Sequence, residues 1–185
     1  MGKYAGRNKE GHHRIEDNDP KSVRVLKEEH HAFRELFDKA EKTEGKALLP
    51  LAREICMRLT VHMTIEEELF YPAAKQVGDA DEVDEGIVEH GAAKDLIAEI
   101  EQLNGDEELF PSKVHVLGEQ TMHHVDEEDE ELFEEVKKAK SGKVDFDAIG
   151  DQLCARRQEL YDEIAQTGET GPTHEAQVEE VPSVK

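Results

Sequence analysis

The sequence predicts an all-α fold built on a four-helix bundle. Of its 185 residues, 37% are charged and 5% are aromatic, and tryptophan is absent. Apolar residues recur every three or four positions over long segments, the spacing of one face of an α-helix. Glycine, proline and asparagine separate these segments into lengths that suit helices. The chain is long enough for one domain with modest tails.

The composition excludes several classes of function. With a formal charge of −22, the chain would be repelled by nucleic acid and by anionic membranes. No stretch approaches the ~20 apolar residues of a membrane span, and the N-terminus has no apolar signal region. We therefore expect a cytoplasmic protein that binds neither nucleic acid nor membrane, with its protein partner unknown. Cys56 and Cys154 lie in apolar helical patterns and are expected to be buried.

The first predicted helix begins near Pro20 and Ser22, because proline fits the opening turn of a helix. Residues 1–19 lack periodicity and are expected to form a flexible arm. The core-facing stripe of this helix steps by four, three and four: Leu26, His30, Phe33 and Phe37. One histidine in such a stripe is usually a core residue. His30 becomes a candidate ligand because later segments repeat the pattern.

The second predicted helix runs from about Ala47 to Pro72, which ends or kinks it. Its stripe is Leu48, Ala52, Ile55, Leu59, His62, Glu66 and Leu69. His62 and Glu66 lie one turn apart, about 5–6 Å between Cβ atoms, where leucines would be expected. Burying the pair without a partner would cost several kcal/mol, so a metal ion is the expected compensation. Tyr71 is expected to pack at a helix interface.

The third predicted helix is capped by Asp79 or Asp81 and ends near Leu103. Its stripe is Val83, Ile87, His90, Ala93, Ile97 and Ile100. His90 therefore takes the same inward position as the histidines of the first two helices.

The fourth predicted helix extends from Pro111 to about Lys140, with a stripe of Leu117, Thr121, His124, Glu128 and Leu132. His123 and Glu127 have the same spacing but lie one step round, and the register with His124 inward is favoured. A further helix over residues 145–166 carries no stripe histidine and is expected to cover the bundle. Residues 167–185 are polar, aperiodic and expected to be disordered.

The candidate ligands repeat in two halves of residues 20–140. The halves are His30, His62, Glu66 and His90, His124, Glu128, with histidine gaps of 32 residues (30 to 62) and 34 residues (90 to 124). Each half is a helical hairpin, and two hairpins form a bundle whose inward side chains can hold metals. Four imidazoles and two bridging carboxylates suit two borderline ions, whereas Ca²⁺ and Mg²⁺ would require mainly oxygen ligands. Iron or manganese fits a paired site with open positions better than zinc.

Four motifs together resemble the hemerythrin-like (HHE) cation-binding domain: LKEEHHAF at 26–33, HxxxEEELFYP at 62–72, EHG at 89–91 and HHVDEEDEELF at 123–133. The resemblance covers residues 20–140 and implies an up-down-up-down bundle with a non-haem, oxo- or hydroxo-bridged di-iron centre. The ligand positions that it implies are His30, His62, Glu66, His90, His124 and Glu128, with both glutamates bridging. Manganese and zinc are the alternative metals.

The sequence departs from the oxygen-carrying hemerythrins at two places. Lys94 stands where those proteins have a further histidine, so the resemblance favours bacterial relatives, including proteins linked to repair of iron centres. Those repair proteins carry an additional N-terminal domain that residues 1–19 do not supply. Aligned on the two Leu-Phe pairs, Asp129 replaces Glu128 as the ligand, although helical spacing favours Glu128.

Three functions follow from these observations. The first is a di-iron protein that binds or senses O₂, NO or peroxide, or buffers iron, without an organic substrate. The alternative is a di-iron oxidoreductase that detoxifies peroxide or NO, or repairs iron centres. A third reading is an acidic interaction protein whose bundle presents a charged surface.

Overall fold

The chain is described here by a computed structural model that covers residues 14–139 and 144–168. Within these residues the structure is helical, with no strand. None of their helices combines the length and the apolar character that a membrane span needs. Most of the predicted arm and tail, including His12, His13 and His174, lies outside the described residues.

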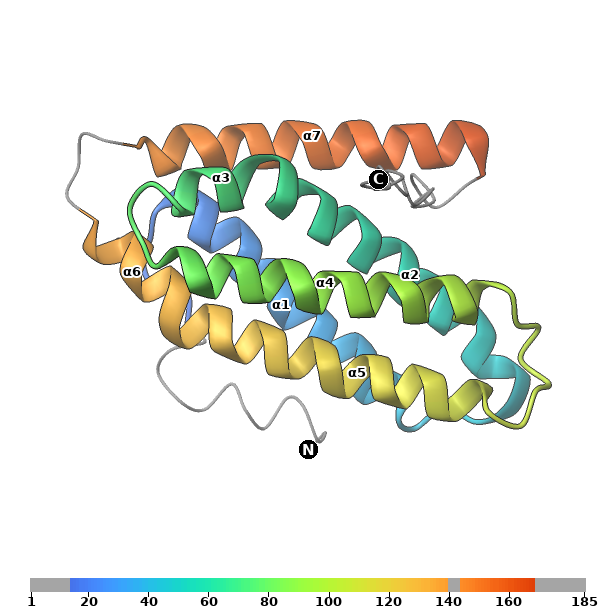
Figure 1. The fold of residues 1–185 in the computed structure, drawn as a ribbon. Coiled ribbons are helices and arrows are strands. Elements are labelled where there is room, and N and C mark those ends of the chain that lie inside the picture. The colour runs from blue at the N-terminus through green and yellow to red at the C-terminus, as the bar shows by residue number, and fades with distance from the viewer. Residues whose placement is uncertain (1–13, 140–143, 169–185) are drawn as a thin grey trace, which may run out of the picture.

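The predicted all-α bundle is confirmed. Its four main helices are α1 (Lys21–Ala40), α2 (Leu48–Ile65), α4 (Ala80–Glu101) and α5 (Phe110–Glu127), and successive helices run in opposite directions (Figure 1). A short 3₁₀ turn, η3 (Gly45–Ala47), precedes α2. Short helices extend two of them, α3 (Tyr71–Ala74) after α2 and α6 (Phe133–Lys138) after α5. The last helix, α7 (Phe146–Thr167), packs mainly on α1 and also contacts α2.

Aspartates begin two of the helices. The side chain of Asp79 accepts a hydrogen bond from the Asp81 backbone N–H at 2.9 Å, which makes Asp79 the cap of α4. Asp145 caps α7 in the same way, accepting from the Ala148 N–H at 3.0 Å. The helix α7 ends at Thr167 and is followed by Gly168, whose φ of 71° suits glycine.

Two π-helical turns interrupt the long helices: η4 (Glu66–Phe70) follows α2 and η5 (Glu128–Leu132) follows α5. A π turn accommodates an extra residue, so the side chains after it change face relative to a continuous α-helix. Phe70 is therefore fully buried, whereas Leu69, predicted to lie in the stripe, is only partly buried. Leu69 still packs against the apolar core, but less deeply than an unbroken α-helix would place it.

The π turns also correct the alignment of the two halves. They place Glu66 opposite Glu128 in the repeat and Tyr71 opposite Phe133, with no gap. Alignment on the two Leu-Phe pairs is therefore one residue out of register.

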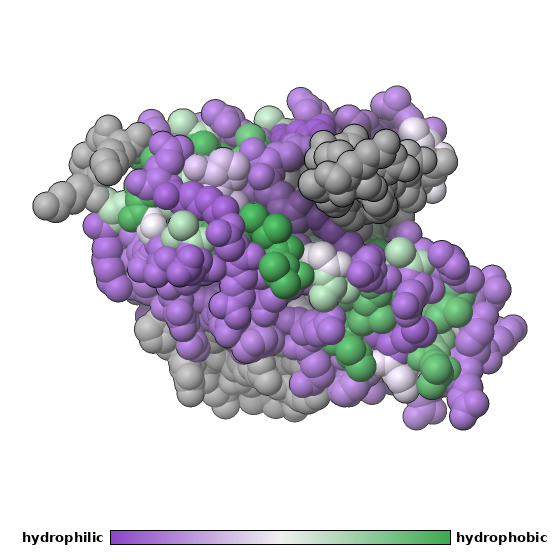
Figure 2. Space-filling model, in the orientation of Figure 1, coloured by the Kyte–Doolittle hydropathy of each residue, from purple (hydrophilic) through white to green (hydrophobic). Residues whose placement is uncertain are grey.

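Apolar residues form two clusters, separated along α1 by the position of His30. One cluster includes Phe33, Phe37, Ile55, Leu59, Ile97 and Leu117. The other includes Val23, Leu26, Ile65, Phe70, Phe133 and Leu153. Ile87, predicted to be in the core, is 41% exposed. The face shown in Figure 2 is mostly hydrophilic, with scattered hydrophobic groups. Between the clusters lies a buried polar layer.

Candidate metal centre

The polar layer brings the six predicted ligands together. The histidines come from four different helices and the glutamates open the two π turns: His30, His62, Glu66, His90, His124 and Glu128. None of these residues is more than 7% exposed. The neighbouring His123 points outward, with 65% of its side chain exposed.

Each inward imidazole nitrogen lies near one of the two glutamates. Glu66 Oε2 is 3.2 Å from His62 Nε2 and 3.4 Å from His90 Nε2. Glu128 Oε2 is 3.3 Å from His30 Nε2 and 3.5 Å from His124 Nε2. Each glutamate thus touches one histidine of each hairpin, as a bridging carboxylate would.

These separations fit common metal ligands. Ligand atoms about 2.0–2.2 Å from one ion lie roughly 3.0–3.5 Å from each other at right-angled to tetrahedral geometry. The four histidine–glutamate distances lie in that range, as does the 3.0 Å between the Nε2 atoms of His90 and His124. These six donors form two groups that share Glu66: His30, His62, Glu66 and Glu128 in one, Glu66, His90 and His124 in the other.

A carboxylate holds the outer nitrogen of every inward histidine. The Nδ1 distances are 3.0 Å for His30 to Asp129, 2.8 Å for His62 to Glu29, 2.9 Å for His90 to Glu67 and 2.7 Å for His124 to Glu89. An ionised carboxylate only accepts hydrogen bonds, so each Nδ1–H donates. The lone pair of a neutral ring then lies on Nε2, which faces the centre. This arrangement orients metal-binding histidines and makes them more basic.

Three of these four carboxylates are themselves bound by a cation. Arg34 Nη2 donates to Asp129 at 3.1 Å, Arg157 Nη1 to Glu29 at 2.9 Å and Lys94 Nζ to Glu67 at 2.6 Å. Lys94 therefore lies behind His90 and does not enter the centre. The structure places Asp129 behind His30, whereas Glu128 faces the other donors.

Sequence reasoning missed this layer of carboxylates, although a signal for it exists. An acid directly precedes His30 and His90 (Glu29 and Glu89), and an acid directly follows Glu66 and Glu128 (Glu67 and Asp129). The same repeat that carries the ligands thus also carries their supports.

Tyr71 is a further residue of the centre, contrary to its predicted role in interface packing alone. It is 1% exposed, and its hydroxyl donates to Glu128 Oε1 at 3.0 Å and lies 3.2 Å from His90 Nε2. Its ring stacks on His90 with centroids 5.3 Å apart. The equivalent residue of the other half, Phe133, stacks on His30 at 5.5 Å and has no hydroxyl. The equivalence of Tyr71 and Phe133 becomes apparent only once both π turns are known, because each residue directly follows one of them.

The pKa values of the residues in the centre are shifted in different directions. Burial and the negative charge of Glu128 raise the pKa of Glu66 well above its usual value, which favours the protonated acid. Burial lowers the pKa of His30, but Asp129 and Glu128 outweigh it and raise the pKa to about 9. Burial, partly offset by Glu67, lowers the pKa of His90 to about 4.

The hydrogen bonding of the donor atoms shows whether the cluster suits metal ions. Several buried atoms at the centre have no hydrogen-bond partner: His30 Nε2, His62 Nε2, both carboxylate oxygens of Glu66 and Glu128 Oε2. Buried polar atoms are rarely left unsatisfied, and metal ions would satisfy all five. The cluster therefore fits a metal site.

Two cavities adjoin the centre. The apolar cavity, of about 180 Å³, lies between α2, α4 and α5. Its lining includes the apolar Leu59, Met63, Ala92, Ala93 and Val125, the centre's His62, His90 and His124, and the polar Glu89, Gln120, Thr121 and His123. The acidic cavity, of about 60 Å³, lies between α4 and the α5–η5 segment and is lined by Glu82, Glu85, Glu89, Glu127, Glu128 and Glu131 with His124.

Comparison with known proteins agrees with this architecture. The family model for the hemerythrin HHE cation binding domain matches residues 21–136. The fold is similar to the crystal structure of a hemerythrin HHE cation binding domain-containing protein from Mycobacterium kansasii, with a TM-score of 0.66 and 18% identity over 84% of this chain and 96% of the other. A search of curated proteins found no match. Because the family model spans more than half of its length, the chain belongs to the hemerythrin HHE cation-binding family.

Proposed function

We propose that the chain is a non-haem di-iron protein that binds O₂, NO or peroxide at the six-residue centre. The observation that carries this proposal is the group of buried, unpaired donor atoms on His30, His62, Glu66 and Glu128. In this proposal His30 and His62 would hold one ion and His90 and His124 the other, with Glu66 and Glu128 as ligands shared between the two. Bound iron would supply redox chemistry and open coordination positions.

The chain's own residues would orient the centre and limit the access of water to it. Glu29, Glu67, Glu89 and Asp129 fix the four rings through their Nδ1–H groups. The apolar clusters on either side exclude bulk solvent. The apolar cavity reaches three of the histidines and has room for a small neutral molecule. These features support a diatomic ligand or peroxide rather than an organic substrate.

Two measurements test this function. Elemental analysis of protein purified without added metal is expected to give two irons per chain. Stopped-flow mixing of the reduced, iron-loaded protein with O₂ or NO under anaerobic handling is expected to change its visible spectrum. Zinc as the bound metal, or spectra that neither gas changes, would contradict the proposal.

Tyr71 favours a second candidate, a di-iron oxidoreductase that consumes peroxide or NO. A hydroxyl 3.0 Å from Glu128 and 3.2 Å from His90 places a proton donor inside the centre. Steady-state peroxide consumption by the iron-loaded protein is expected to exceed that of an equal concentration of free iron. A rate no greater than that of free iron would dismiss the enzyme and leave the binding protein.

A further inference from the structure

The four carboxylates behind the histidines differ in what lies beyond them. Arginine or lysine binds three of them: Arg34 on Asp129, Arg157 on Glu29 and Lys94 on Glu67. Within the described part of the chain, Glu89 has no such partner. Its Oε1 instead faces His123 Nε2 at 3.9 Å, while its Oε2 accepts from His124. Glu89 thus faces a histidine, whereas the other three carboxylates bind an arginine or a lysine.

Glu89, His123 and Glu127 form a second, outer group of donors. His123 Nε2 is 3.2 Å from Glu127 Oε1, and one donor atom from each of the three residues lies within 4.8 Å of the others. One imidazole nitrogen with two carboxylate oxygens is a donor set that suits a divalent first-row metal ion. The side chain of His123 is 65% exposed, so solvent reaches this group.

The acidic cavity extends from the two glutamates of this outer group to the inner centre, whereas His123 lines the apolar cavity. Glu89 and Glu127 line it together with His124 and Glu128, and no lysine or arginine is among its described lining residues. Glu82 Oε2, in the lining of this cavity, is buried without a hydrogen-bond partner, whereas Glu128 Oε2, at its inner end, belongs to the inner centre. Glu128 is only 5% exposed. Because no lysine or arginine is among the described residues that line this cavity, a cation that enters it would bind an unpaired oxygen there.

Gly86 keeps this cavity open at its inner end. A Cβ at Gly86 would lie 3.0 Å from Tyr71 Oη and 3.4 Å from His124 Cε1. Any larger side chain would therefore narrow the space beside His124.

We propose that Glu89, His123 and Glu127 form an outer site for a divalent cation, and that the acidic cavity is the path from this site to the inner centre. The inference rests on the proposed function, since the inner centre is the destination of the ion. Clefts lined by one sign of charge concentrate counter-ions and raise association rates. The outer site would take a hydrated Fe²⁺ from solution and release it inward.

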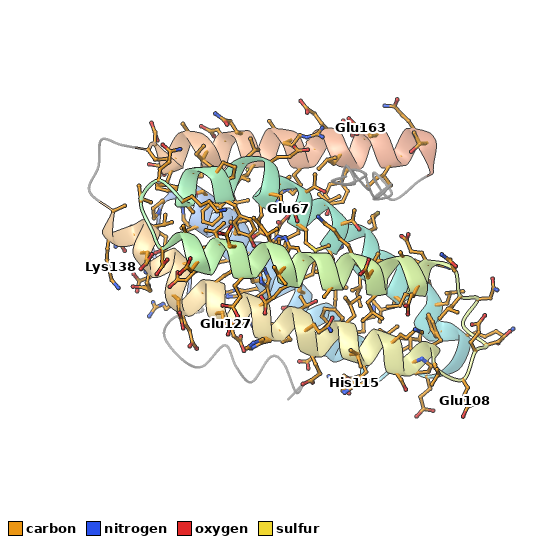
Figure 3. The ribbon with its side chains drawn as sticks, in the orientation of Figure 1. Glu67, Glu108, His115, Glu127, Lys138 and Glu163 are labelled. Carbon is orange, nitrogen blue, oxygen red and sulfur yellow. The ribbon has the colours of Figure 1, made fainter. Side chains whose placement is uncertain are left out.

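The test is the rate of metal uptake by the metal-free full chain. Co²⁺ is the probe, because its visible absorption changes when it enters a histidine and carboxylate site, and uptake is followed by stopped flow. His123→Ala and Glu127→Gln are the test variants. The controls, His115→Ala and Glu108→Gln, remove the same groups toward the other end of the bundle (Figure 3). Both test positions are partly or largely exposed, so the variants should fold.

The test variants are expected to take up Co²⁺ about tenfold more slowly, with the controls within about twofold of the natural chain. With two equivalents of Co²⁺ per chain, the final amount in the inner centre should remain two ions in all five proteins. High salt should slow the natural chain and reduce the difference, because surface charges are screened. A titration of protein with a filled inner centre should reveal a third, weaker ion that His123→Ala abolishes.

The possible failures are distinguishable. Equal uptake rates with two ions per chain would overturn the outer site and leave the proposed function intact. A final amount below two in the test variants would assign these residues to the inner centre and would also overturn the proposal. No uptake by the natural chain would overturn both.

Discussion

Arg157 Nη1 on α7 donates to Glu29 Oε1 on α1 at 2.9 Å, and the other oxygen of Glu29 accepts from His62. The C-terminal helix therefore acts on the centre, although it lies outside residues 21–136 that match the family. Burial raises the pKa of Glu29, but its bonds to His62 and Arg157 outweigh burial and keep that pKa below the usual value. An ionised Glu29 holds His62 in the tautomer that turns a lone pair inward.

Arg157→Gln is expected to weaken metal binding. Loss of a direct partner of a metal-binding histidine typically costs tenfold to 100-fold in affinity, and the loss of Arg157, one contact further out, should cost about threefold to tenfold. Competition with a chelator of known affinity measures the change. Arg156→Gln is the matched control, because Arg156 binds the exposed carboxylate of Glu68. Equal affinities of the two variants would show that α7 only covers the bundle.

Glu66→Gln should preserve or raise the stability of the metal-free protein but lower the number of metal ions bound. The substitution removes a buried acid whose pKa is raised by burial and by Glu128, so the metal-free protein should be unchanged or more stable by about 1 kcal/mol. Metal binding should fall from two ions to at most one, because a neutral amide bridges poorly. Denaturant unfolding and elemental analysis provide the two readings. Glu68→Gln, two residues away on the surface, should alter neither.

Metal affinity is expected to rise with pH up to about 9. Below that pH the metal-free His30 carries a proton, and an ion must displace it, so each displaced proton gives about a tenfold gain in affinity per pH unit. Proton release during binding, measured in weakly buffered solution, checks this directly. Binding that releases no protons at pH 7 would contradict the assignment of His30 as a ligand.

The metal-free protein should show the opposite trend in stability. Because the folded pKa of His30 is about 9, above its ordinary 6.5, its contribution is complete below pH 6.5 and is lost as pH rises through 9. Denaturant unfolding of metal-free protein between pH 6 and pH 10 measures the loss. His30→Gln should flatten this part of the profile.

Tyr71→Phe is expected to destabilise the metal-free protein by about 1–3 kcal/mol, the cost of leaving one buried carboxylate oxygen unpaired. The oxygen concerned is Glu128 Oε1, which accepts from the Tyr71 hydroxyl. Bound metal should reduce the loss, because an ion stabilises the same carboxylate. Comparison of unfolding with and without metal makes the test, and Tyr161→Phe on α7 is the control. An equal loss in both states would indicate a packing role alone.

Much of the fold and of the centre is predictable from the sequence, because both depend on a local period. His30, His62, His90 and His124 follow from a helical stripe in which each replaces an apolar residue. Such periodicity fixes which face turns inward as long as the helix is regular. The inward placement of His124 rather than His123 follows from the same rule.

Other features depend on contacts between helices and could not be predicted in this way. The π turns change the face of Leu69 and Tyr71 without any local sequence signal. Ile87 fits the stripe of α4, yet its side chain is 41% exposed. The bond between Arg157 and Glu29 joins residues 128 apart.

Because Tyr71 lies in one half and Phe133 in the equivalent position of the other, only one half brings a hydroxyl to the centre. Two ions bound there would therefore differ in surroundings even though their histidines and bridging groups match. In an iron-loaded sample this inequality would appear as two separate Mössbauer doublets of equal area.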